Sequence, residues 1–363
     1  MRYHGGTAFP HQTESDLDFA RVTAMFAVIM IHVTSSYIYA ESHIALGGMN
    51  LAFLLNQMSQ FAVPLFVLLS GASLGLSTSQ YSPGTFYRKR LAKLLPPYLI
   101  WCLLYYFYNP LTNTLRPLDL SPHGILALLR TLLLGQAASH LYFIPVIFQC
   151  YLLYPLLKKW LQRAPGAVLL VAFALTFATQ ELYFLLDRQV SLPFPSLHPY
   201  LWMLFPAWGF YFVLGALLTG ERLDQLSAFA RHWRWLVLPV VLLLALLFAK
   251  VSFTTGFIIA VKPDLTLYVP LILLGCLSAW QVLRPLPFAL PVVRFLADHS
   301  LTTYFSHVMV LNFFRRNLFF AQGMQGMVLL YLCVAVVSLL LAFCLDHLLT
   351  WLRSLRSRPA VPV

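Results

Sequence analysis

The stretch DLDFARVTAMFAVIMIHVTSSYIY (Asp16–Tyr39) is apolar enough to cross a membrane, yet it carries Asp18, Arg21 and His32. Ionisable side chains in a spanning helix are costly, so they usually face a protein interior or a water-filled cavity. A helix turns about 100° and rises about 1.5 Å per residue, so His32 lies on nearly the same face as Arg21 and about 16 Å further along. The sequence therefore predicts a helix with a carboxylate and a guanidinium at its entry and an imidazole near mid-membrane.

The composition of the chain is that of a membrane protein. Of its 363 residues, 60% are hydrophobic and 10% are charged, whereas a soluble globular domain carries about 25% charged residues. The formal net charge is +12, but the basic residues stand in short clusters between apolar runs, which is typical of cytoplasmic anchoring and not of nucleic-acid binding. We expect an all-α, polytopic integral membrane protein whose five cysteines are apolar packing residues.

Runs of about 17–25 apolar residues predict about ten transmembrane helices in a single domain that covers residues 1–363. A short cytoplasmic N-terminus (1–16), which lacks the pattern of a signal peptide, and a basic C-terminal tail (353–363) flank the helices. The stretch GILALLRTLLLG (124–135) is too short to cross and is expected to lie at the interface or to re-enter. The predicted spans cover residues 17–40, 51–76, 94–109, 141–160, 166–186, 200–219, 235–251, 265–283, 300–320 and 327–352.

Lysine and arginine residues in the loops predict the orientation of the chain. With a cytoplasmic N-terminus, 16 of them lie in inside segments and 7 in outside segments. This asymmetry favours two cytoplasmic termini and an even number of spans.

A basic segment, FYRKRLAKLLPPY (86–98), leads into the third predicted span, with Pro96 and Pro97 expected near the start of that helix. Topology anchoring is one explanation of its four cations. The other is a phosphate site, because arginine binds phosphate bidentately and lysine binds it as a point charge. Arg88, Arg90 and Lys93 are therefore candidate phosphate ligands.

Polar side chains near the predicted outer surface are candidates for a substrate pocket. Asn56 and Gln60 lie in the outer half of the second span, where they serve either for polar helix packing or as amides that bind a sugar. His140 lies at the outer mouth of the fourth span, either as an interfacial belt residue or as part of an outward-facing acceptor site.

A second intramembrane histidine strengthens the case for a site. His307 lies about 13 Å into the ninth span by helix rise, at a depth close to that of His32, and Tyr304 precedes it by one turn. A neutral imidazole is a natural general base near pH 7, although packing against a neighbouring helix also explains a buried histidine. A metal site is not expected, because the chain has no HExxH or CxxC motif and no acidic ligand at a matching spacing.

Five motifs, in this order, resemble those of the acyltransferase-3 family of bacterial inner-membrane acyltransferases, and among its members the chain is most similar to surface-polysaccharide O-acetyltransferases. The first is the Arg-x10-His motif of the family, here Arg21 to His32. Two positions depart from the family pattern: the second arginine of an Arg-x-x-Arg motif is Lys93, and the tryptophan after an outer His-Leu is Tyr142. The other motifs are PLFVLLSG (64–71), FYRKRLAKLLPPYL (86–99), HLYFIPVIFQCYLLYPLL (140–157) and DHSLTTYFSHVMVL (298–311).

The resemblance implies a multi-pass enzyme of the bacterial inner membrane that moves an acyl group, acetyl, from cytosolic acyl-CoA to a hydroxyl of a cell-surface or lipid-linked saccharide. Its partners would be the bilayer, acyl-CoA as donor substrate and the saccharide, with no permanently bound cofactor. Arg21 and the basic segment would hold the phosphates of the donor, and Asp18 would orient Arg21. His32 would take the hydroxyl proton, or carry the acyl group itself. The alternative is a transporter or flippase for a lipid-linked glycan, which would not bind CoA.

Overall fold

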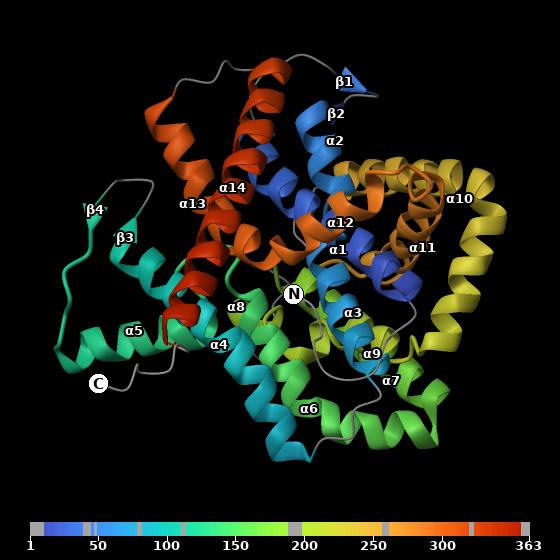
Figure 1. Ribbon diagram of the computed structural model, residues 1–363, viewed down its shortest axis with the longest axis horizontal. Helices are drawn as coiled ribbons and strands as arrows, with labels where there is room; N and C mark the ends of the chain where they lie inside the picture. The colour runs from blue at the N-terminus through green and yellow to red at the C-terminus, as the bar shows by residue number, and fades with distance from the viewer. Residues whose placement is uncertain are drawn as a thin grey trace, which may run out of the picture.

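The computed structural model describes residues 11–38, 45–46, 49–77, 82–109, 114–187, 198–255, 261–318 and 323–356. Most of the expected N-terminal segment (1–16) and most of the expected basic tail (353–363) lie outside these residues. The described part of the chain is almost entirely helical, with two short antiparallel strand pairs, β1 with β2 and β3 with β4 (Figure 1). Its elements are α1 (His11–Thr34), β1 (Ala45–Leu46), β2 (Met49–Asn50), α2 (Leu51–Met58), α3 (Ala62–Gly75), α4 (Pro83–Phe107), β3 (Tyr108–Asn109), β4 (Thr114–Leu115), α5 (Pro122–Leu134), α6 (Phe143–Arg163), α7 (Pro165–Asp187), α8 (His198–Leu201), the 3-10 helix η2 (Phe205–Ala207), α9 (Gly209–Ala216), α10 (Gly220–Thr255), α11 (Leu265–Leu283), α12 (Ala289–Asp298), α13 (Ser300–Asn317) and α14 (Met324–Arg356).

Several stretches of the described residues are long and apolar enough to cross a membrane, which agrees with an all-α, polytopic membrane protein. The predicted number of ten spans and the sides of the termini stay predictions. The six stretches are Glu14–Thr34, Leu51–Gly75, Pro165–Leu186, Gly220–Phe253, Leu265–Leu283 and Met324–Trp351.

Several predicted spans differ from the structure. The second keeps its predicted bounds but is broken into α2 and α3 by a turn at residues 59–61. The sixth (200–219) is divided among α8, η2 and α9. The third, α4, begins well before the predicted start at residue 94, because Ser82 caps it and Pro83 occupies its first turn. Pro96 and Pro97 therefore lie inside the helix and not at its start. The basic segment consequently belongs to α4 itself, so its side chains are fixed at helical spacing.

The long helix α10 also extends beyond its predicted span (235–251). It has 36 residues, with Pro239 in its interior, and Figure 1 shows it turning sharply along its course. Proline removes one backbone hydrogen bond and its ring displaces the preceding turn, which bends a helix. The bend lets the second half of α10 lie along α11 and α2.

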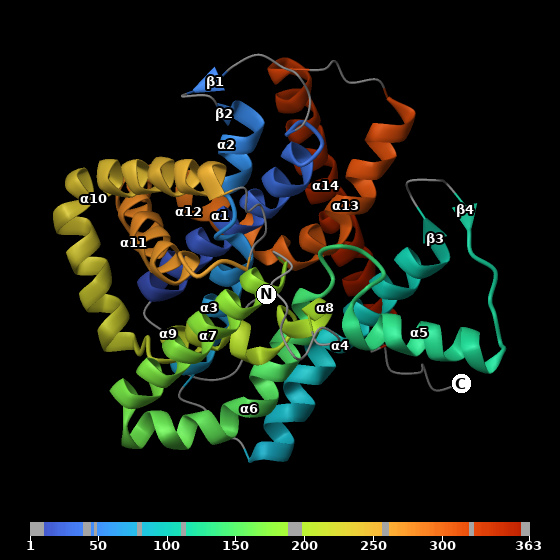
Figure 2. The same ribbon diagram turned by 180° about the vertical axis from the view of Figure 1, so that it is seen from behind.

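Helix α1 runs through the middle of the helical array, as both views show (Figures 1 and 2). It packs against α3, α11, α12 and α13. Beside it, α3 and α9 approach so closely that a Cβ on Gly71 would lie 2.1 Å from the carbonyl oxygen of Phe212. Small residues permit such close contact between helices in membranes. The polar residues of α1 therefore face protein, where ionisable groups in a membrane are usually found.

Candidate active site

Three histidines from distant parts of the chain meet inside the protein. His32 comes from the last turn of α1, His140 from the turn between α5 and α6, and His307 from α13. The ring centroid of His307 lies 5.1 Å from that of His32 and 4.9 Å from that of His140, and the centroids of His32 and His140 are 6.0 Å apart. His140 and His307 are buried and His32 is partly buried. Among the described residues, no three His, Cys, Asp or Glu side chains are arranged to hold a metal ion.

Backbone carbonyls fix the protonation of two of these rings. Nε2 of His140 lies 3.3 Å from the carbonyl oxygen of Phe305, and Nδ1 of His307 lies 2.7 Å from that of Tyr304. A carbonyl oxygen only accepts, so each of these nitrogens carries the hydrogen of a neutral imidazole. Nδ1 of His140 and Nε2 of His307 are then proton acceptors, and both are buried without a hydrogen-bond partner in the described structure.

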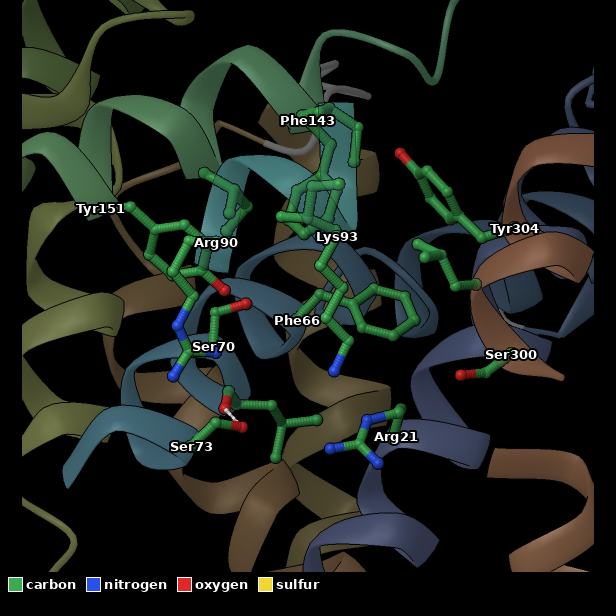
Figure 3. Close-up of a pocket in the computed structure, with 15 residues that line it drawn as sticks. Arg21, Phe66, Ser70, Ser73, Arg90, Lys93, Phe143, Tyr151, Ser300 and Tyr304 are labelled. Carbon is green, nitrogen blue, oxygen red and sulfur yellow. Dashed lines mark hydrogen bonds between the residues drawn. The ribbon is translucent and has the colours of Figure 1, made fainter. Parts of the chain in front are cut away.

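A cavity of about 130 Å³ has a basic end formed by α1 and α4. Arg21, Arg90 and Lys93 line it, and Figure 3 shows the side chains of Arg21 and Lys93 extending into the same space. The guanidinium of Arg21 also donates a hydrogen bond to the carboxylate of Asp18, one turn earlier on α1. Three cations from two helices thus converge on one opening, an arrangement that suits an anion with several phosphate groups.

Arg88 does not line this cavity and is exposed. Helical spacing explains the difference, because Arg90 and Lys93 are three residues apart on one face of α4, whereas Arg88 and Arg90 are only two apart. Of the three candidates in the basic segment, the structure brings Arg90 and Lys93 to Arg21 and leaves Arg88 outside.

The other end of the cavity is aromatic and borders on the histidines. Phe66, Phe143 and Tyr304 form it. The ring centroid of Tyr304 lies 5.4 Å from that of His140 and 5.9 Å from that of His307, and the Tyr304 hydroxyl donates to the carbonyl oxygen of His140. Tyr304 therefore lies at the boundary between the basic cavity, which it lines, and the histidine cluster, which its ring contacts.

A second and larger cavity, of about 710 Å³, lies beyond His140. Most of the side chains that line it carry a polar atom, including Arg116, whose guanidinium lies 4.5 Å from the ring centroid of Tyr106. Tyr105 also lines it, with its ring centroid 5.4 Å from that of His140 and its hydroxyl donating to the carbonyl oxygen of Phe305 at 2.9 Å. The histidine cluster is thus placed between two cavities, one basic and aromatic, the other roomy and polar.

Asn56 and Gln60 do not line either cavity. The amide nitrogen of Asn56 donates to the carbonyl oxygen of Ile31 at 3.0 Å and to the hydroxyl of Thr34 at 3.1 Å. The amide nitrogen of Gln60 donates to the side-chain oxygen of Asn56 at 2.8 Å. Both residues are buried, so the structure supports polar packing around the end of α1 and not a wall of amides that contacts substrate.

The profile of a family described as an acyltransferase domain (Acyl_transf_3) matches residues 14–347, which is nearly the whole chain. The chain belongs to the acyltransferase-3 family. This result confirms the family that the five motifs indicated, and with it a membrane acyltransferase.

One relative of this acyltransferase-3 protein is YfiQ of Bacillus subtilis (strain 168), whose name assigns it provisionally to the membrane-bound acyltransferases. The two sequences are 23% identical over 290 residues, which cover 79% of this chain and 78% of YfiQ. No solved structure matches the chain.

Sequence reasoning missed three contributors to the site of this acyltransferase-3 protein. Tyr105 was an unremarked aromatic residue of a predicted span, and Ser70 and Ser300, which line the basic cavity, appeared only within longer motifs. Each lies beside the site because of contacts between helices far apart in the chain. Hydropathy and spacing within one helix carry no signal for such contacts.

Proposed function

We propose that this protein is an O-acyltransferase of the bacterial inner membrane. It transfers an acyl group, acetyl, from cytosolic acyl-CoA to a hydroxyl of a cell-surface or lipid-linked saccharide. The observation that carries the proposal is the line formed by the basic cavity, the three histidines and the polar cavity. Acyl-CoA has phosphates at one end and a thioester at the other. It therefore needs a cationic opening for the phosphates that leads inward to the residues that react with the thioester.

The basic cavity supports the assignment of the donor. Acyl-CoA is anionic at its nucleotide end, and Arg21, Arg90 and Lys93 offer three cations at the opening. The pantetheine arm is slender and suits the narrow aromatic part beside Phe66 and Tyr304. Asp18, paired with Arg21, orients the guanidinium for phosphate.

The polar cavity supports a hydroxylated acceptor. Its volume of about 710 Å³ lies in the range of small-molecule sites. Its wall of hydroxyl, amide and guanidinium groups can form hydrogen bonds with a saccharide. Approach from this side would bring an acceptor hydroxyl to the histidines from the side opposite the basic cavity, so that donor and acceptor meet beside them.

His32 is the residue that we assign to the chemistry at the thioester. It is the partly exposed member of the cluster and belongs to the same helix as Arg21. In a direct transfer, His32 takes the proton that leaves the acceptor hydroxyl and returns it to the departing thiolate of CoA. In a two-step transfer, His32 itself carries the acyl group between the two substrates.

The test is acyl transfer by purified protein in liposomes, with radiolabelled acetyl-CoA as donor and neutral mono- and oligosaccharides as acceptors. The wild type is compared with His32→Ala and with His232→Ala, which removes an exposed histidine of α10. We expect His32→Ala to lower kcat by at least about 100-fold, the usual contribution of a general base, while acetyl-CoA binding persists. Full transfer by His32→Ala would contradict the assignment, and transient label on the wild-type protein would favour the two-step route.

A further inference from the structure

Two histidines beside His32 have no chemical role of their own in the function proposed above, although both are buried and each has an unsatisfied ring nitrogen. An imidazole that serves only for packing would be expected to have both nitrogens satisfied, since burying an unpaired polar group costs about 1–3 kcal/mol. His140 and His307 each use one nitrogen to hold the ring against a backbone carbonyl. Each keeps the other nitrogen, Nδ1 of His140 and Nε2 of His307, as a buried acceptor without a partner in the described structure.

The position of His140 points to the acceptor side. Ser139, its neighbour in the chain, lines the polar cavity, and so does Tyr105, whose ring packs edge-on against that of His140. The three ring centroids form a triangle, in which His307 lies 4.9 Å from His140 and 5.1 Å from His32, both shorter than the 6.0 Å between His140 and His32. At these separations, facing ring nitrogens come within reach of a hydrogen bond after small ring rotations.

We infer that His140, His307 and His32 form a proton relay that joins the polar cavity to the basic cavity. This inference rests on the function proposed above and refines its direct route: His140 takes the acceptor proton first, and His32 receives that proton through the relay. The O–H bond of the acceptor breaks and its proton moves to Nδ1 of His140, while the acceptor oxygen forms a bond to the acyl carbon. The bond from that carbon to sulfur breaks, and the thiolate of CoA leaves on the side of the basic cavity.

The proton then follows the leaving group. It passes from Nδ1 of His140 to Nε2 of His307 and from there to His32, which delivers it to the thiolate. One proton leaves oxygen and one arrives at sulfur, so the transfer is balanced without another reactant. The hydrogens on Nε2 of His140 and Nδ1 of His307 stay with their carbonyls throughout, which limits the two rings to small rotations about these anchors.

The carbonyl anchors allow a test that separates relay from packing. Glutamine places an amide nitrogen where histidine has Nε2, so His140→Gln keeps the hydrogen bond to Phe305 and loses the acceptor at Nδ1. Asparagine matches Nδ1 in the same way, so His307→Asn keeps the hydrogen bond to Tyr304 and loses Nε2. His232→Gln, on the exposed face of α10, is the control.

The measurements are kcat and KM for acetyl-CoA in liposomes, with melting temperature as the check of folding. We expect each isosteric variant to lose at least about 100-fold in kcat, with KM for acetyl-CoA and the melting temperature close to wild type. A kcat within about tenfold of wild type in both variants would overturn the relay, because their packing contacts are preserved. If the wild type neither binds acetyl-CoA nor transfers label, the proposed function fails and the relay fails with it.

A second variant keeps the inference testable if an isosteric variant does not fold. His140→Ala leaves a space beside the polar cavity, and free imidazole is added to the assay at increasing concentration. Recovery of at least about tenfold in kcat, saturating with imidazole, would support a proton-accepting role. No recovery in folded His140→Ala protein would count against a proton-accepting role of His140, because free imidazole in the vacated space would restore the missing proton acceptor.

Discussion

At the scale of single residues, Asn56 and Gln57 of α2 form hydrogen bonds that connect a buried lysine to α1, although neither amide lines a cavity. Lys262, which is 2% exposed, donates to the side-chain oxygens of Gln57 and, at 2.8 Å, of Ser252. Gln57 donates in turn to Asn56 at 3.1 Å, and Asn56 reaches the carbonyl of Ile31. The buried cation is thus connected to the C-terminal end of α1, where a positive charge is favourable. The sequence predicted Asn56 as a candidate pocket residue. Lys262 lies in the loop before α11, and no pattern in the sequence connects it with Asn56.

Lys262 should give the protein a distinct dependence of stability on pH. Burial lowers the pKa of Lys262 to about 8, whereas the unfolded chain keeps the lysine charged up to about pH 10.4. Below pH 8 the folded state bears the full cost of the buried cation. Between pH 8 and 10.4 the unfolded state binds more protons, so rising pH favours folding, by up to about 3 kcal/mol. The melting temperature of the wild type should therefore rise with pH relative to that of Lys262→Met. Lys159→Met, which removes an exposed lysine, is the control for lost charge. A difference in melting temperature between the wild type and Lys262→Met that stays constant from pH 8 to about 10.4 would contradict the prediction.

At the scale of elements, apolar runs predicted the position of most helices but not their breaks. The predicted span 265–283 coincides with α11, because its polar boundaries are sharp. The break between α2 and α3 was missed, because the apolar runs on both sides of Ser59 and Gln60 predict one continuous span. The early start of α4 was missed because charged side chains hid a good helix start at Ser82-Pro83. Apolar length indicates what can be buried, whereas caps and turns decide where a helix begins and ends.

The turn after α5 is the element that positions His140, and it depends on one glycine. Gly135 ends α5 with φ of 65°, and a Cβ there would lie 2.7 Å from the carbonyl carbon and oxygen of Leu141. Gly135→Ala should therefore displace this turn, beyond the roughly 1–2 kcal/mol that a left-handed alanine costs. We expect a lower melting temperature and a loss of transfer of at least about tenfold, with acetyl-CoA affinity retained because the basic cavity is elsewhere. Gly166→Ala, where a Cβ meets nothing within 4 Å, is the matched control, and equal activity of the two variants would show that the turn does not position His140.

At the scale of the whole molecule, the site combines what the sequence could predict with what only packing decides. Helix rise placed His32 and His307 at similar depth, and the structure puts their ring centroids 5.1 Å apart. The contact of His140 with these two histidines was not predictable. His140 lies in a turn, and a turn has no helical periodicity from which the depth of a side chain in the membrane could be calculated. The two cavities likewise arise from elements that are distant in the chain: α1, α3, α4, α6 and α13 form the basic cavity, and α4, β4, α5 with the turn after it, and α13 form the polar cavity.

The two cavities should open to opposite sides of the membrane, as the excess of Lys and Arg in the predicted cytoplasmic loops requires. Lys89 is exposed on α4 near the basic cavity, and Leu118 is 60% exposed between β4 and α5, near the polar cavity. With the exposed Cys344 replaced by serine, Lys89→Cys and Leu118→Cys are each treated with a membrane-impermeant thiol reagent in intact cells and in inverted vesicles. We expect Leu118→Cys to react in cells and Lys89→Cys in inverted vesicles. Labelling of both positions from one side would contradict a path that takes its donor from the cytosol and its acceptor from outside.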